Sequence, residues 1–240
     1  MLRYRLLRSL LMAAVVMVAI PQAANAQAYS SRLWSFDFGG GYTLPLGSLS
    51  DVSSGGFGFT VGANYFVSDL LGLRVETGGD FLSGKDDDLL ISNPLVNGEP
   101  GAPSVRFYHI LGGLDFDFVD PADPDNSFRF QLFLLGGAAI VNSDKFAAPP
   151  SPTFPNGLVN GSWQDAYPEF RGGIRLGFAL GDCAPQRARV CGELFFTGGS
   201  HIMFANEEDT AAIASLYRGA SPFGTAITLP LTLGIRLNVR

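Results

Sequence analysis

Ser200 and His201 are the residues of this sequence whose types could support nucleophilic catalysis. A serine becomes a nucleophile only when a base, and an acid that orients the base, lie within hydrogen-bond reach. Neighbours on a β-strand point to opposite faces, so Ser200 and His201 are weak catalytic candidates. We expect His201 to be an ordinary residue at the base of a loop, and we expect no enzymatic activity.

Cysteine and histidine are scarce, which limits metal and redox chemistry. Cys183 and Cys191 flank a turn-like segment. In an oxidising compartment we expect a disulfide between them that staples a hairpin, with two free thiols as the alternative. A metal site is not expected, because the chain offers two histidines and no further cysteine. No cofactor is expected either. Glycine pairs recur along the chain, for example Gly78-Gly79 and Gly112-Gly113, but none follows the strand–turn–helix pattern of a phosphate-binding loop.

Arginine, aspartate and glutamate recur at alternate positions of strand-like segments, and their charges nearly balance. Opposite charges packed inside a lumen can satisfy one another, which burial demands. We therefore predict a lumen charge network formed by Arg74, Glu76, Asp115, Arg129, Arg171, Arg175, Glu193 and Arg236. Within it, Arg175–Glu193 and Asp115–Arg129 are the ion pairs expected between neighbouring strands.

The segments that carry these charges alternate with period two, which is typical of β-strands with unlike faces. Along residues 227–239 every odd position is aliphatic, and the even positions hold Thr, Pro, Gly, Arg and Asn. Seven more such segments are 33–44, 56–66, 71–81, 105–119, 127–141, 168–180 and 189–199. Short connections (67–70, 120–126, 181–188) alternate with mostly longer ones (45–55, 82–104, 142–167, 200–224). This pattern predicts an all-β fold, an eight-stranded antiparallel up-and-down transmembrane β-barrel.

The apolar face of these strands is predicted to point outward. Aromatic residues gather at both strand ends, as in the interfacial girdles of a membrane barrel. The opposite face is mostly small, and no charge falls in the middle of the apolar face, where one would cost about 2–4 kcal/mol. A soluble barrel with the two faces exchanged is the alternative.

The N-terminus predicts export. Residues 1–26 combine three arginines, a short apolar run and a small-residue cleavage site, which indicates a signal peptide, so residues 27–240 would form the barrel domain. Its removal would leave 13 of the 16 basic residues against 22 acidic ones. That balance argues against nucleic acid as a partner.

The segment Gly41-Tyr42-Thr43-Leu44-Pro45-Leu46-Gly47 closes the first predicted strand. With the strand pattern, residues 30–240 resemble the small outer-membrane β-barrel superfamily (OmpA/OmpX-like, outer membrane protein β-barrel domain). The chain departs from that family at its end, Asn238-Val239-Arg240, where an aromatic residue is usual.

The resemblance implies a location in the bacterial cell outer membrane. The partners it implies are membrane lipid and lipopolysaccharide, the outer-membrane assembly machinery and an extracellular ligand at the loops; we expect a monomer. An eight-stranded barrel is just wide enough for side chains to fill it. The expected role is therefore structural or surface interaction, with the lumen plugged by charged residues. A lipid A-modifying, deacylase-like barrel enzyme, a narrow channel and a soluble periplasmic β-protein are the alternatives.

Overall fold

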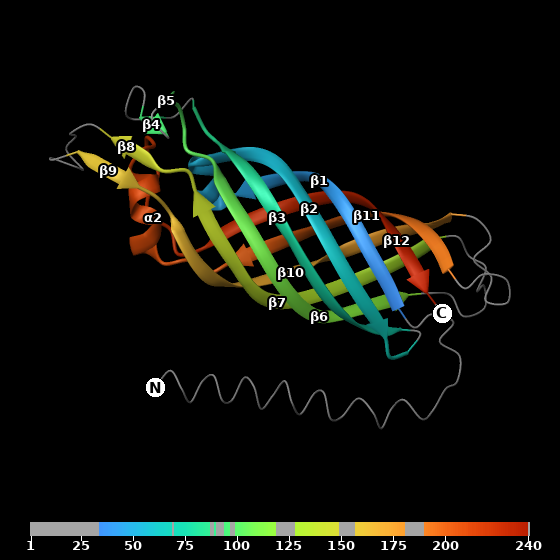
Figure 1. Ribbon diagram of the computed structural model, residues 1–240. Helices are drawn as coiled ribbons and strands as arrows, with labels where there is room; N and C mark the ends of the chain where they lie inside the picture. Colours follow the sequence, from blue (N-terminus) through green and yellow to red (C-terminus); the bar gives the residue numbers. More distant parts are fainter. Residues whose placement is uncertain are drawn as a thin grey trace, which may run out of the picture.

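The computed structural model describes residues 34–68, 70–86, 89, 94–96, 99–118, 128–148, 157–180 and 190–239. The predicted signal peptide and Cys183 lie outside these residues. The main body is a closed barrel (Figure 1). Its strands are β1 (Trp34–Leu46), β2 (Ser53–Phe66), β3 (Leu71–Gly84), β6 (Val105–Phe118), β7 (Phe128–Ser143), β10 (Gln164–Leu180), β11 (Val190–Met203) and β12 (Ala226–Val239).

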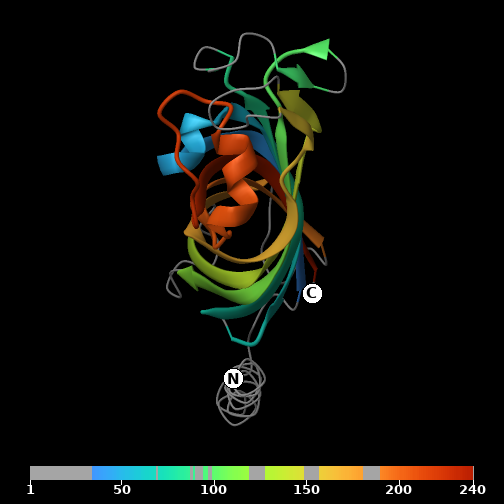
Figure 2. The same ribbon diagram turned by 90° about the vertical axis from the view of Figure 1, so that its left-hand side faces the viewer.

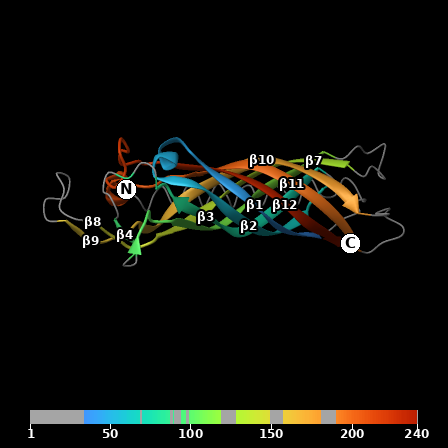
Figure 3. The ribbon, with the colours of Figure 1, turned by 90° about the horizontal axis from the view of Figure 1, so that it is seen from above.

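Every neighbour in the barrel is antiparallel, and β1 closes the sheet by pairing with both β2 and β12. Trp34 at the start of β1 lies opposite Val239 at the end of β12, so the barrel begins and finishes at the same end. Figure 3 shows the strands running from that end to the one that carries β8 and β9. The predicted eight-stranded antiparallel barrel is confirmed. None of the described helices is long and apolar enough to cross a membrane.

The two faces of the wall follow the predicted alternation. On β6, β7 and β12 exposed apolar residues alternate with buried ones, and Ile110 and Leu134 expose 66% and 60% of their surface. The inward positions hold arginines such as Arg74 and Arg236, which are 1% and 0% exposed. An apolar outer belt around a polar interior is the inverse of a soluble barrel and matches a barrel in hydrocarbon.

Glycines allow the narrow wall to close. A Cβ atom at Gly41 would lie 1.9 Å from the backbone oxygen of Leu231 on β12. At Gly113 and Gly137 it would lie 2.1 Å from backbone oxygens on the neighbouring strand. Such close approach of two backbones requires residues without a side chain. At these three positions glycine is therefore needed for neighbouring strands to pack against each other.

The loop end contains structure that the sequence did not predict. Four short strands form a second sheet in the order β5-β4-β8-β9, with bounds Glu99–Pro100, Leu95–Val96, Phe146–Ala148 and Leu158–Gly161. A 3-10 helix, η2 (Gly47–Asp51), follows β1, and α2 (Glu207–Ala214) follows β11. Figure 2 shows α2 lying across the mouth of the barrel. Its first turn holds three acidic residues, whose negative charges stabilise the helix by interacting with the positive, N-terminal end of its dipole.

An apolar cluster joins α2 to the upper lumen. Trp163 is completely buried, and its ring lies 5.8 Å from Phe107 and 5.4 Å from Phe223, centroid to centroid. Its indole N–H donates to the Tyr167 hydroxyl (3.0 Å), which donates to Asp209 on α2 (2.7 Å). This bond and one from Asn206 lower the pKa of Asp209. The cluster, called here the apolar cap, comprises Leu49, Val52, Leu82, Val105, Phe107, Ala139, Val141, Phe146, Trp163, Tyr167, Met203, Ile213, Leu216, Tyr217, Phe223 and Ala226.

Candidate functional site in the polar lumen

Below the apolar cap, all eight barrel strands send polar side chains into the lumen. Within the described part of the chain these include five arginines and five carboxylates, called here the lumen network, and none is more than 7% exposed. Its members are Asp37, Arg74, Glu76, Asp115, Asp117, Arg129, Arg171, Arg175, Glu193 and Arg236. They come close because the inward positions of facing strands share a space only as wide as the side chains themselves.

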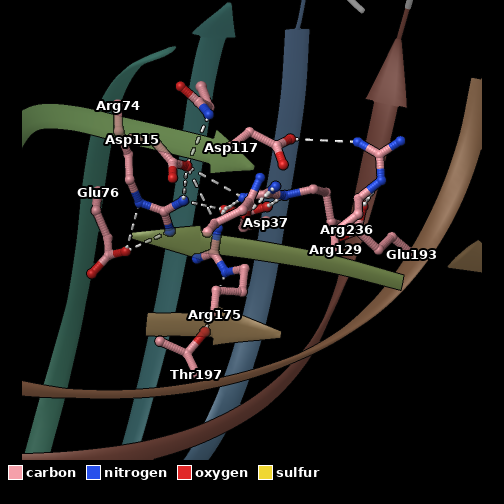
Figure 4. A network of polar contacts seen from close by, with 12 residues as sticks. Asp37, Arg74, Glu76, Asp115, Asp117, Arg129, Arg175, Glu193, Thr197 and Arg236 are labelled. Atoms are coloured by element: carbon pink, nitrogen blue, oxygen red, sulfur yellow. Dashed lines mark hydrogen bonds and ion pairs between the residues drawn. The ribbon is translucent and has the colours of Figure 1, made fainter. Parts of the chain in front are cut away.

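Asp37 on β1 is the centre of this network (Figure 4). Its Oδ1 accepts a hydrogen bond from Nε of Arg236 at 2.6 Å, and its Oδ2 accepts one from Arg74 at 2.6 Å. A guanidinium nitrogen of Arg175 lies 3.0 Å from the same Oδ2. One buried carboxylate thus faces three guanidinium groups from three other strands, β3, β10 and β12.

Asp115 on β6 supplies a second carboxylate to the same arginines. Its Oδ2 lies 3.5 Å from Arg74, 3.6 Å from Arg236 and 3.9 Å from Arg175. Asn64 on β2 donates a hydrogen bond to this oxygen at 2.9 Å. Sharing two carboxylates among three arginines links strands on opposite sides of the barrel.

Towards the loop end, Glu76 bridges two further arginines. It accepts hydrogen bonds from Nε and a terminal nitrogen of Arg74, at 3.1 and 2.6 Å, and it pairs with Arg171. The ring of Phe133 lies between 5.3 and 6.0 Å from the guanidinium carbons of Arg74, Arg171 and Arg175. An aromatic face stabilises cations at such distances, most strongly away from water.

Towards the turn end, Arg129 lies 3.4 Å from Asp117 and 3.8 Å from Glu193. Arg129 thus joins two carboxylates at this end of the lumen. Arg236 belongs to the centre of the network, where it donates hydrogen bonds to the Gln131 side chain, at 2.6 Å, and to Asp37.

All eight residues predicted for the network lie buried in the lumen, but the two predicted pairs are wrong in detail. The register places Arg175 opposite Thr197, to which it donates a hydrogen bond, and its guanidinium reaches Asp37 rather than Glu193. Arg129 contacts Asp117, two residues beyond the expected Asp115. The prediction also left out Asp37, although its alternation with apolar neighbours on β1 marked it as inward-facing.

A second polar group lies between the lumen network and the apolar cap. It consists of Asp80 on β3, His109 on β6, Glu169 on β10 and His201 on β11, called here the histidine cluster, and all four are buried. Nδ1 of His201 lies 2.5 Å from Glu169 and 3.9 Å from Asp80. The two imidazole rings meet edge to face, with centroids 4.9 Å apart. Ser200 lies on the other, outward face of β11 and is half-buried, so it points away from this cluster.

The cysteine prediction stays open. Cys191 lies on β11 opposite Asn238, at the turn end of the barrel, and it is buried. Its expected partner, Cys183, is outside the described residues, so the disulfide stays a prediction.

No protein-family model and no curated protein matches the chain. Similar solved structures include Neisserial surface protein A, which is 12% identical, with 88% of this chain and 99% of that chain covered and a TM-score of 0.45. Ail, the attachment invasion locus protein of Yersinia pestis, is 12% identical, with 85% of this chain and 96% of that chain covered and a TM-score of 0.41. OprG from Pseudomonas aeruginosa is 9% identical, with 87% of this chain and 97% of that chain covered and a TM-score of 0.40.

The fold assignment itself rests on the geometry of this chain. Eight antiparallel strands close in order, long connections gather at one end, and an apolar belt surrounds a polar lumen. These features together define the OmpA/OmpX-like architecture that the sequence predicted. The chain therefore has the fold of a small β-barrel of the bacterial outer membrane.

Proposed function

We propose that the protein is a non-enzymatic outer-membrane barrel with a structural or surface-interaction role, and that its lumen is plugged. The observation that carries the proposal is the burial of the ten-residue lumen network, none of whose members is more than 7% exposed. A pore needs its polar groups in contact with water. These groups are instead paired with one another across the lumen, as at Asp37 and Arg236, 2.6 Å apart.

The apolar cap supports the same proposal. Trp163, Phe107 and Phe223 fill the lumen above the charges, and α2 lies across the mouth (Figure 2). An ion entering from the loop end would first meet an apolar barrier and then buried charged groups that are already paired with one another. Both layers would have to open for conduction.

A planar-bilayer recording tests the plug directly. The folded mature chain should give no stable conductance steps, while a general porin reconstituted in the same way provides the positive control. Insertion is checked beforehand by the shift in gel mobility between unboiled and boiled samples. Reproducible wild-type channels with the same conductance in every preparation would contradict the plug and favour the narrow-channel alternative.

The interaction role is proposed for the loop end, where recognition is usually located on a rigid scaffold. The small sheet stands beyond the barrel wall, and Leu95 on β4 exposes 46% of its surface. Phe146 on β8 belongs to the apolar cap, so a loop deletion should spare it. Replacing residues 149–156 with a short Gly-Ser turn should leave folding intact and reduce binding of cells to lipopolysaccharide-bearing or host surfaces.

The lipid A-modifying alternative is tested at His201. The proposal excludes catalysis there because Ser200 faces away from the ring and the ring lies under the apolar cap. A His201→Gln variant should leave the lipid A of the host strain unchanged. Lipid A that differs between wild type and this variant, with equal amounts of folded barrel, would favour the enzyme.

A further inference from the structure

We infer that the histidine cluster is a binding site for one divalent transition-metal ion, with Asp80, His109 and His201 as ligands and Glu169 in the outer shell. The first three residues each offer a ligand atom, and these atoms all lie within 4.8 Å of one another. Tetrahedral zinc with bonds of about 2.0 Å places its ligand atoms roughly 3.3 Å apart. The ligand atoms that lie furthest apart therefore need to approach by up to about 1.5 Å, a movement that small χ rotations supply.

Unmet hydrogen-bonding capacity points to a ligand at this place. Both ring nitrogens of His109, Nε2 of His201 and Oδ2 of Asp80 are buried and make no hydrogen bond within the described part of the chain. His109 is 1% exposed, so bulk water does not compensate for it. Leaving a buried donor or acceptor without a partner costs about 1–3 kcal/mol per group. A metal ion would satisfy one acceptor from each of the three residues at once.

Two close polar contacts leave one ligand atom of His201 and one of Asp80 available. Oε1 of Glu169 lies 2.5 Å from Nδ1 of His201, so Nε2 is the nitrogen available to a metal. Thr43 donates to Oδ1 of Asp80 at 2.7 Å, which leaves Oδ2. A carboxylate on the second ring nitrogen of a ligating histidine is the usual outer-shell arrangement in metal sites, where it fixes the tautomer and the ring.

The wall makes room for these side chains. A Cβ atom at Gly78, opposite His109, would lie 2.7 Å from its Nε2, and one at Gly58 would lie 2.4 Å from Oδ1 of Asp80. Next to Asp80, Glu169 and His201 lies a cavity of about 10 Å³, bounded on its cap side by Phe107 and Met203. That volume suits about one water-sized particle, so a water molecule could complete the coordination of the ion.

The ligand set defines the class of metal. Two imidazoles and a carboxylate suit Zn²⁺, Cu²⁺, Ni²⁺ or Fe²⁺, whereas Mg²⁺ and Ca²⁺ prefer oxygen ligands alone. The site lies beneath the apolar cap and its side chains are buried, so the role we assign is structural. The ion would connect the neighbouring strands β3 and β6 to β11, which is not adjacent to either of them in the barrel. It would enter while the barrel folds.

The test is to refold the untagged mature chain with Zn²⁺, remove loose metal with a chelator, and measure bound metal by mass spectrometry. An untagged chain matters because His109 and His201 are its two histidines. We expect roughly one zinc per folded chain and at least a tenfold lower content in the His109→Gln/His201→Gln double variant. Asp51→Asn, on η2 outside the lumen, is the matched control and should keep the metal.

Refolding with Co²⁺ gives a second readout that does not depend on the variants folding. Wild type should show the visible absorption of four-coordinate cobalt, and X-ray absorption should detect two imidazole ligands. The inference is overturned if wild type retains no Zn²⁺, Co²⁺ or Cu²⁺ after the chelator wash, or if the folded double variant retains as much as wild type. It is equally overturned if bound cobalt is coordinated by oxygen alone.

Discussion

Removal of the charge of Asp37 should destabilise the barrel more than any other conservative change in the lumen network. Its carboxylate contacts Arg74, Arg175 and Arg236 at 2.6 to 3.0 Å and is fully buried. Asp37→Asn keeps the size of the side chain and leaves five buried guanidinium groups facing four carboxylates. Breaking a buried ion pair by removing one partner costs about 3–5 kcal/mol. We expect the free energy of unfolding to fall by that amount.

The assay is urea unfolding of the barrel refolded in lipid vesicles, with the folded fraction taken from gel mobility and from tryptophan fluorescence. Asp144→Asn is the control, because Asp144 also pairs with an arginine, Arg106, whose side chain is 41% exposed. Exposed pairs contribute about 0–1 kcal/mol, so this variant should unfold close to wild type.

A double variant separates the effect of unbalanced buried charge from the effect of the altered side-chain shape. Asp37→Asn combined with Arg236→Gln restores equal numbers of buried charges of each sign, four and four. The two changes should therefore cost less together than the sum of the single variants, since residues of one network couple. The reasoning is refuted if Asp37→Asn costs no more than Asp144→Asn, or if the double variant is simply additive.

Three further experiments test the wall and its turn end. Leu134 exposes 60% of its surface on the outer face, so Leu134→Arg should destabilise the barrel by about 2–4 kcal/mol and impair its insertion. The control, Leu95→Arg on the loop sheet, should insert normally. Equal insertion of the two variants would contradict the assignment of the apolar face to lipid. Gly41→Ala should cost about 1–3 kcal/mol or more, because its Cβ would meet a backbone oxygen of β12, and an unchanged urea midpoint would contradict that close approach. Thiol labelling of the denatured, unreduced chain should find Cys183 and Cys191 unreactive, and two labelled thiols would exclude the disulfide.

The strands of the barrel wall were predictable because successive residues face lipid and lumen in turn. In a membrane barrel each residue faces either lipid or lumen, so apolar and polar types alternate at the single-residue level. Leu231, Leu233 and Ile235 alternate with Thr232 and Gly234 for this reason, and the strand limits follow to within a few residues. At the loop end the membrane no longer imposes that rule. Strands of two to four residues such as β4 and β9, and the eight-residue α2, depend on tertiary contacts that leave no local period.

The sequence predicted which polar side chains point into the lumen, but not which of them contact one another. The alternation shows which residues point inward, whereas their height along the barrel depends on the stagger between strands. A shift of two residues keeps a side chain on the same face and moves it to another partner, which is why Arg129 contacts Asp117 and not Asp115. The meeting of the two histidines depends on the stagger in the same way. His109 and His201 lie on β6 and β11, separated in the barrel by β7 and β10, and their separation in sequence says nothing about their meeting. Only the closed register puts both rings at one height, so a chain with two histidines and no metal-binding motif can still assemble a metal site from its fold.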